Sequence, residues 1–270
     1  MKIIILGNGY IANRIKDYGI DATIVDRQIM FVDNVVDILK EHKPDVVINA
    51  IGYVGDLNTM DCEQYPNRTL LSNTCVPILI FEACLKQHVK MVHISSACLF
   101  DYNYDNQFPI AEQAMPDWYK LLYARSKIYS DQALYPFAFS KKLLMIRLRI
   151  PLDKKRHNRN LLDKLIRYKK VIDLPNSVTY MPDFVAALKH LIAEDATGVY
   201  NVMSKGSLFY PDLMNEYKKY DPDFEFEVID GNELRRTNIL LDISKLTRLY
   251  EMPNINDRIK ECVEGWWNDK

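Results

Sequence analysis

The sequence predicts an α/β fold: a doubly wound parallel sheet followed by a smaller α+β region. Two observations predict it. Short apolar runs recur through the first 150 residues and alternate with segments of helical character, a pattern typical of parallel sheets. The chain also opens with a strand, a glycine-containing turn and a helix, the arrangement that dinucleotide-binding sheets use. We therefore expect a Rossmann-like domain over residues 1–150 and a smaller substrate-binding region over residues 151–270.

The glycine turn follows the first expected strand, Lys2 to Leu6. In a G-x-G-x-x-A turn, Gly7 makes the bend, Gly9 lets the backbone approach a pyrophosphate, and Ala12 permits close packing of the next helix. The alternative is a βα turn that binds no ligand. The residues that we expect to contact a dinucleotide here are Gly7, Gly9, Tyr10 and Ile11.

The second expected strand, Ala22 to Val25, ends at Asp26 and Arg27. An acid at this place normally accepts a hydrogen bond from the ribose 2′-hydroxyl of NAD, whereas an arginine can accept the 2′-phosphate of NADP. The adjacent pair therefore leaves the choice of cofactor open.

The remaining elements follow in the same alternation. A third strand, Asp45 to Asn49, is followed by Ala50 and Gly52 at its carboxyl end, where ligands bind in open α/β sheets. From Pro151 onward the elements become shorter and the loops more charged. Further helices are expected over 32–42, 69–86, 161–168, 211–220 and 255–267, with strands over 90–94, 143–147, 171–173 and 199–201.

A candidate catalytic set lies between the fourth and fifth strands. Tyr123 and Lys127 are four residues apart on an expected helix and so share one face. A nearby ammonium lowers the pKa of a tyrosine and suits it to protonate a carbonyl that is being reduced. Ser96, at the end of a strand, could hydrogen-bond the same oxygen. The alternative is an exposed helix pair, although Tyr123 is the only tyrosine with a lysine four residues on.

Composition narrows the class of function. Lys and Arg number 35 against 36 Asp and Glu, so there is no electrostatic case for nucleic acid. No apolar run approaches the length of a bilayer span and no signal peptide is visible, so we expect a cytoplasmic protein without a membrane partner. The histidines show no metal-ligand spacing. The five cysteines are scattered, which indicates neither a disulfide framework nor a metal site.

Several segments together resemble the extended short-chain dehydrogenase/reductases. Within them, the chain is similar to the bifunctional nucleotide-rhamnose synthases (UDP-4-keto-6-deoxyglucose 3,5-epimerase/4-reductases), which are close to the dTDP-4-dehydrorhamnose reductases. The segments that carry the resemblance are Asn49-Ala50-Ile51-Gly52, Asn58, Cys62-Glu63, Ala97 to Tyr102, Tyr123 with Lys127, Arg149-Ile150-Pro151, Arg159-Asn160, Lys164, Arg167-Tyr168, Pro175-Asn176-Ser177, and Arg236 with Asn238.

The resemblance implies two chemistries at one site. Ser96, Tyr123 and Lys127 would reduce a 4-ketone with NADPH, while Cys98 and Lys164 would act as the acid/base pair of an epimerase. The shortened glycine turn and Asp26 depart from the family pattern, which makes NADH the alternative cofactor. The residues that the resemblance assigns to the nucleotide-sugar are Ser96, Cys98, Arg159, Asn160 and Arg236.

Cys98 and Lys164 also have purely structural interpretations, and the chain has alternative functions. Cys98 could be a small buried hydrophobe and Lys164 part of a solvated helix face. The chain could be a 4-ketosugar reductase without epimerase activity, or a non-catalytic NAD(P)-binding regulatory subunit. The expected partners are a UDP-sugar substrate and an upstream 4,6-dehydratase, with a homodimer as a further expectation.

Overall fold

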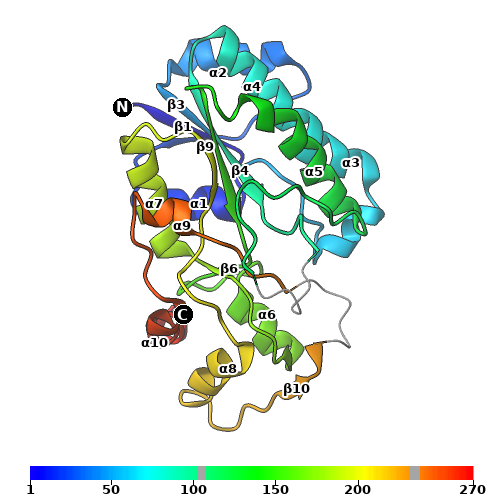
Figure 1. Cartoon of the computed structure of the whole chain (residues 1–270), viewed down its shortest axis with the longest axis vertical. Coiled ribbons are helices and arrows are strands. Elements are labelled where there is room, and N and C mark those ends of the chain that lie inside the picture. Colours follow the sequence, from blue (N-terminus) through cyan, green and yellow to red (C-terminus); the bar gives the residue numbers. More distant parts are fainter. Residues whose placement is uncertain (102–107, 232–237, 270) are drawn as a thin grey trace. The chain divides into compact units, whose positions relative to one another are not determined.

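The computed structural model describes residues 1–101, 108–231 and 238–269, and the chain divides into two compact units (Figure 1). Unit 1 comprises residues 1–100, 115–147 and 189–200, and unit 2 comprises residues 101–114, 148–188 and 201–270. A single division at residue 150 differs from this one at two places, because the described residues 108–114 belong to unit 2 and residues 189–200 belong to unit 1.

Unit 1 is built on a six-stranded sheet. Its strands are β1 (Ile3–Leu6), β2 (Thr23–Val25), β3 (Val46–Asn49), β4 (Lys90–Ser96), β5 (Leu143–Leu148) and β9 (Gly198–Asn201). The order across the sheet is β2-β1-β3-β4-β5-β9. β1 pairs in parallel with β2 and with β3, and β3 pairs in parallel with β4. The predicted doubly wound sheet is confirmed.

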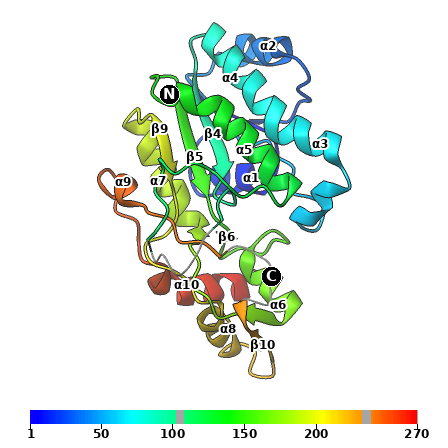
Figure 2. The same ribbon diagram turned by 45° about the vertical axis from the view of Figure 1, so that its right-hand side comes forward.

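Helices cover both faces of this sheet. They are α1 (Tyr10–Asp17), α2 (Val32–His42), α3 (Pro66–Leu70), α4 (Val76–Lys86) and α5 (Leu122–Leu134), with 3₁₀ turns η1 (Thr59–Glu63) and η4 (Tyr135–Phe137) and a π-helical turn η2 (Leu71–Cys75). In both views α2, α4 and α5 lie side by side over one face, and α1 lies on the other (Figures 1 and 2). Connections between parallel strands are right-handed as a rule, and the strand order shows that the chain reverses its direction across the sheet after β2, which places helices on both faces.

The core of unit 1 is aliphatic, as a sheet covered on both faces requires. Ile4 and Val47 of the sheet pack in one buried cluster with Ile38 of α2 and Ile80 of α4. All four side chains are at most 1% exposed. At about 25 cal/mol per Å² of buried apolar surface, such residues supply the main stabilisation of the unit.

The helical run Pro66–Lys86 joins α3, η2 and α4 without a break. Among the residues that the structure describes, it is the one helix whose length and composition alone would suffice to cross a bilayer. Its apolar residues Val76, Ile80 and Phe81 are buried in the core of unit 1. Packing against the sheet therefore accounts for its apolar composition.

Unit 2 has its own core. Its elements are β6 (Pro151–Leu152), α6 (Leu161–Tyr168), β7 (Lys170–Ile172), β8 (Thr179–Tyr180), α8 (Tyr210–Lys218), β10 (Glu227–Ile229), α9 (Ser244–Thr247), α10 (Ile255–Asn268) and the first part of α7 (Met181–Ala193). Two small sheets pair β10 with β7 and β6 with β8. Leu165, Leu213, Val263 and Trp266 lie in its hydrophobic cluster.

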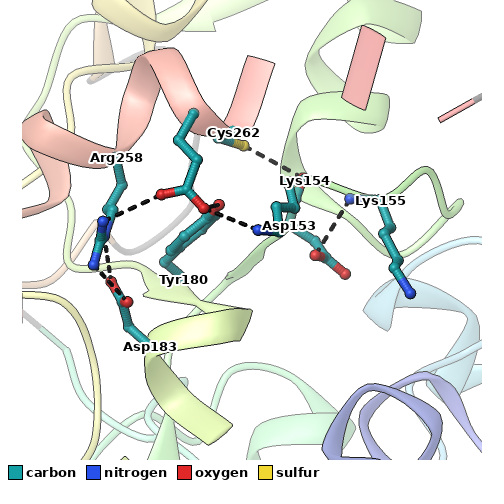
Figure 3. A network of polar contacts seen from close by, with 8 residues as sticks. Asp153, Lys154, Lys155, Tyr180, Asp183, Arg258 and Cys262 are labelled. Carbon is teal, nitrogen blue, oxygen red and sulfur yellow. Dashed lines mark hydrogen bonds and ion pairs between the residues drawn. The ribbon is translucent and has the colours of Figure 1, made fainter. Parts of the chain in front are cut away.

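Polar contacts fix α10 within unit 2 (Figure 3). Glu261 accepts hydrogen bonds from Lys154 Nζ at 3.0 Å and from the Tyr180 hydroxyl at 3.2 Å. Arg258 donates both Nε and Nη2 to the carboxylate of Asp183, at 2.9 and 3.0 Å. These bonds connect α10 with the segment after β6, with β8 and with the first turn of α7.

The strand predicted over residues 199–201 is present, but it lies in a different part of the fold from the one expected. The sequence places it in the smaller C-terminal region, but it is β9, the edge strand of the main sheet beside β5. The local sequence encodes a strand, and only packing at the edge of the large sheet determines which sheet it joins.

Candidate active site

Helix α5 carries both Tyr123 and Lys127, and both side chains are buried, at 8% and 4% exposure. The start of the helix is held from outside, because the Leu122 backbone N–H donates to Glu63 Oε1 at 2.6 Å. This bond satisfies one of the amides that every helix start leaves unpaired. The structure confirms that Tyr123 and Lys127 lie on a single helix, and both side chains are on its buried part.

Tyr123 and Lys127 both lie against the segment that follows β3. The Tyr123 ring packs in a small cluster with Tyr53 and Cys62. The Lys127 ammonium comes so close to Gly52 that a Cβ on that glycine would be 3.2 Å from Nζ. A side chain at position 52 would therefore require the tip of Lys127 to shift by a few tenths of an ångström. Both candidate side chains therefore lie beside the carboxyl end of β3, where ligands bind in open sheets.

Asn73 joins this segment to α5. Its Oδ1 accepts the Tyr53 N–H at 2.8 Å, and its Nδ2 donates to the Tyr53 carbonyl at 2.8 Å and to Ser126 Oγ at 3.0 Å. Ser126 Oγ in turn donates to the Tyr123 carbonyl. Asn73 lies in the π-helical turn η2, a feature often found at functional sites. Asn73 therefore ties the segment after β3 to α5.

Ser96 and Cys98 form one tight turn after β4. Ser96 Oγ accepts the Cys98 backbone N–H at 3.0 Å, which fixes the position of the serine oxygen. The Cys98 side chain is partly buried and packs against the cluster that contains Tyr123. The structure therefore brings Cys98 and Tyr123 to the same small cluster.

The electrostatics behind Lys127 come from buried groups. Burial lowers the pKa of Lys127 to about 8, and the Asp131 carboxylate partly opposes this shift. Asp131, 1% exposed, accepts a hydrogen bond from Arg147 Nη2 at 2.6 Å. His93 of β4 is fully buried, and burial together with Lys127 holds its pKa well below the usual range. At neutral pH His93 is therefore uncharged, and Lys127 is mostly protonated.

The glycine turn fits a dinucleotide. Gly7 has φ +96°, and a Cβ there would be 2.9 Å from the Ile51 side chain, so two independent reasons demand glycine. A Cβ on Gly9 would meet no described protein atom within 4 Å, so packing against the protein does not require this glycine. It leaves open space at the start of α1, where amide groups and the helix dipole favour a phosphate.

Three strand ends meet beside this turn. The Gly7 N–H donates to the Val25 carbonyl at 3.1 Å, and the Ala50 N–H donates to the Leu6 carbonyl at 3.0 Å. Asp26, next after Val25, is exposed. The predicted cofactor residues of β1, β2 and β3 therefore lie at one edge of the sheet.

The remaining predicted residues belong to unit 2. Lys164 is half-buried on α6. Asn160 is fully buried, and its amide is used by the loop itself: Oδ1 accepts the Asp153 and Leu162 N–H groups, and Nδ2 donates to the Asp153 carbonyl. Asn160 therefore shapes the loop that carries Arg159. Arg236 lies outside the described residues.

Sequence reasoning missed the supporting residues Glu63, Asp131 and Arg147. Asp131 had a visible signal, because it follows Lys127 by four residues on the same helix. Glu63 belongs to a segment that carries the family resemblance, but nothing in the sequence indicated its bond to Leu122, 59 residues away. Nothing indicated the bond of Arg147 to Asp131, 16 residues away, either. Among the described residues, no group of three or more His, Cys, Asp or Glu side chains could hold a metal ion.

Two curated plant proteins are similar to this chain. A bifunctional dTDP-4-dehydrorhamnose 3,5-epimerase/dTDP-4-dehydrorhamnose reductase of Arabidopsis thaliana is 25% identical over 88% of this chain and 81% of its own length. A trifunctional UDP-glucose 4,6-dehydratase/UDP-4-keto-6-deoxy-D-glucose 3,5-epimerase/UDP-4-keto-L-rhamnose-reductase of the same plant is also 25% identical, but the chain spans only 38% of its length.

Two solved structures share the fold. The UDP-rhamnose synthase of Acanthamoeba polyphaga mimivirus has a TM-score of 0.90 at 21% identity, covering 98% of this chain and 99% of its own. The dTDP-4-dehydrorhamnose reductase of Bacillus anthracis, in complex with NADP, has a TM-score of 0.79 at 18% identity and covers both chains completely.

The family follows from the sequence match. Residues 4–167 match the model of the NAD dependent epimerase/dehydratase family. That range contains the glycine turn, the Ser96–Cys98 turn and the pair of Tyr123 and Lys127. The resemblance drawn from these residues is thereby confirmed, and the chain belongs to the NAD dependent epimerase/dehydratase family.

Proposed function

We propose that this chain is a bifunctional 3,5-epimerase/4-reductase that converts UDP-4-keto-6-deoxy-D-glucose to UDP-L-rhamnose with NAD(P)H. The observation that carries the proposal is the contact of Cys98 with the cluster that holds Tyr123. A reductase needs Tyr123, Lys127 and Ser96, but it has no need of a thiol beside them. The names of the similar proteins, which combine epimerase and reductase or describe a rhamnose synthase, support the same function.

The reduction step uses α5 and the end of β4. A bound nicotinamide dinucleotide supplies the hydride that adds to C4 of the sugar. Tyr123 donates its proton to the C4 oxygen, and Ser96, whose Oγ is held by the Cys98 amide, hydrogen-bonds that oxygen. Lys127 stabilises the phenolate that remains, because its pKa of about 8 keeps the larger part of it cationic at neutral pH.

Epimerisation uses the same ketone. The C4 carbonyl acidifies the hydrogens at C3 and C5, so a base can remove one of them and an acid can return a proton to the opposite face. We assign Cys98 and Lys164 as this acid/base pair. Ser96 and Tyr123 stabilise the enolate oxygen that forms between the two proton transfers.

The nucleotide end of the substrate is assigned to unit 2. Arg159 contributes a guanidinium suited to a diphosphate, and Asn160 holds the loop that presents it. The substrate itself must come from a 4,6-dehydration of a UDP-hexose. The trifunctional relatives include a UDP-glucose 4,6-dehydratase in their names, and this chain spans 35–38% of their length.

Proton NMR in D₂O tests the proposal. The purified protein is given UDP-4-keto-6-deoxyglucose first without cofactor and then with NADPH or NADH. Deuterium uptake at C3 and C5, followed by a rhamnose-configured product, is the expected result. Oxidation of the cofactor without deuterium exchange would show a 4-ketosugar reductase that lacks epimerase activity. If neither exchange nor oxidation is observed, the proposed enzymatic function is wrong.

A further inference from the structure

The end of β2 carries an ion pair that bears on the choice of cofactor. Arg27 Nη1 lies 2.7 Å from Glu41 Oε2, and Arg27 Nη2 lies 2.9 Å from Glu41 Oε1. Both nitrogens at the tip of the guanidinium therefore face one carboxylate, in a paired geometry that also suits a phosphate. Glu41 is on the last turn of α2, and β2 ends at Val25.

This pair lies next to the place where the two dinucleotides differ. The Gly7 N–H is bonded to the Val25 carbonyl, so Asp26 and Arg27 follow directly from the residue that contacts the glycine turn. An adenine ribose seated by that turn would present its 2′ position to the end of β2. NADP carries a dianionic phosphate at this position and NAD carries a neutral hydroxyl.

The charges here favour the hydroxyl. Asp26 and Glu41 each carry a negative charge. Arg27, which follows Asp26 in the sequence and pairs with Glu41, carries a positive charge. The three groups sum to −1. Hydrogen bonding between the partners raises the pKa of Arg27 and lowers that of Glu41, so both are ionised at neutral pH. His42 Nε2 also lies 3.5 Å from Glu41 Oε1. A 2′-phosphate would meet net negative charge and would have to displace Glu41 from the guanidinium.

We propose that Glu41 is a cofactor-specificity residue: by occupying Arg27 it excludes the 2′-phosphate, so that this protein binds NAD(H) in preference to NADP(H). The inference rests on the proposed function, since it assumes that the glycine turn binds a dinucleotide. It departs from the NADPH that the family resemblance implies. Glu41 acts through Arg27, and Asp26 accepts a hydrogen bond from the ribose 2′-hydroxyl.

Calorimetric titration with NAD⁺ and NADP⁺ tests the inference without turnover. The measured quantity is the ratio of the Kd for NADP⁺ to the Kd for NAD⁺. We expect this ratio to exceed one in the unaltered protein. We expect Glu41→Gln to lower it by about tenfold, because the substitution removes one negative charge and loosens the hold on Arg27.

Two further variants make the test specific. Glu82→Gln breaks a similarly exposed ion pair, that of Glu82 with Lys86 at 2.7 Å on α4, and changes net charge equally, so its ratio should match that of the unaltered protein. Arg27→Gln combined with Glu41→Gln should lose the gain in NADP⁺ binding, because no guanidinium remains to bind the phosphate.

The outcomes separate the two proposals. An unchanged ratio in Glu41→Gln, or tighter binding of NADP⁺ by the unaltered protein, overturns the role of Glu41 while the proposed reductase stands. If neither dinucleotide binds, the inference and the proposed reductase fall together.

Discussion

Cys98 and Tyr123 contact the same small cluster, yet the proposed chemistry gives them separate steps. Tyr123→Phe keeps the ring and removes the proton that O4 needs. We expect reduction to fall on the order of 10³-fold, while deuterium exchange at C3 and C5 continues. Cys98→Ala should instead stop exchange at one or both carbons and so block net conversion. NMR in D₂O measures both effects in one sample.

Cys75→Ser is the matched control for Cys98, because Cys75 is an exposed thiol on η2. It should leave both exchange and reduction unchanged. If Cys98→Ala forms the L-sugar at a near-normal rate, the epimerase role of this thiol is wrong.

A second prediction concerns Asp131 and the pH dependence of reduction. Lys127 has a pKa of about 8, and Asp131 is the group that raises it against burial. Reduction should therefore decline as the pH rises through about 8, where Lys127 loses its charge. Asp131→Asn removes the supporting carboxylate, so this alkaline decline should begin at lower pH. The pH profile of kcat/KM measures the shift.

Ser130→Ala provides the comparison, since the Ser130 hydroxyl donates to the Lys127 backbone carbonyl and carries no charge. Its profile should keep the alkaline limb of the unaltered protein. An Asp131→Asn profile with an unshifted limb, in a variant that still folds by circular dichroism, would show that Asp131 does not tune Lys127.

Among the elements, α5 depends on contacts from α3, η1 and η2. The Asn73 side chain hydrogen-bonds the N–H and the carbonyl of Tyr53 and the hydroxyl of Ser126. Asn73→Ala removes all three bonds: the buried Tyr53 N–H loses its partner, while Ser126 Oγ keeps its bond to the Tyr123 carbonyl and the Tyr53 carbonyl keeps the Cys62 thiol. A buried polar group left unpaired costs about 1–3 kcal/mol, and the lost bonds add to that cost. We expect unfolding free energy, measured by urea titration, to fall by about 3 kcal/mol.

The control for this element is Asn67→Ala on α3, because Asn67 is exposed on the same helical run. Its effect should remain within about 0.5 kcal/mol, as for most surface substitutions. Equal losses in the two variants would mean that Asn73 does not hold the strand end and α5 together.

On the scale of the whole molecule, the two units have separate hydrophobic cores. Trp266 of α10 is 7% exposed and donates its Nε1–H to Asp163 at 2.9 Å. Truncating a buried tryptophan to alanine costs about 3–5 kcal/mol, a large part of the stability of a small core. We expect Trp266→Ala to increase amide hydrogen exchange in α6, α8 and α10 while β1, β3 and β4 stay protected.

Glu264→Ala, at an exposed position of the same helix, should change the exchange of neither unit. If the amides of the large sheet lose protection together with those of α10, the two cores unfold as one cooperative unit and are not independent.

The fold was predictable to the extent that local pattern encodes it. Buried strands read as continuous apolar runs, and the α2 helix, Val32–His42, has the predicted bounds because an amphipathic stripe ends at Lys43-Pro44. The glycine turn and the shared helix of Tyr123 and Lys127 were also readable, because both depend on spacings of only a few residues.

What the sequence by itself determined is therefore the class of fold, the turn at the cofactor edge and the helix of the candidate catalytic pair. Only the tertiary structure decided that β9 joins the large sheet, that Asn73 bonds Tyr53, that Asp131 pairs with Arg147, and that Glu41 occupies Arg27. The physical reason is one of range. Periodicity and turn chemistry act between neighbouring residues, whereas these partners, 14 to 20 residues apart or farther, are selected by the packing of whole elements.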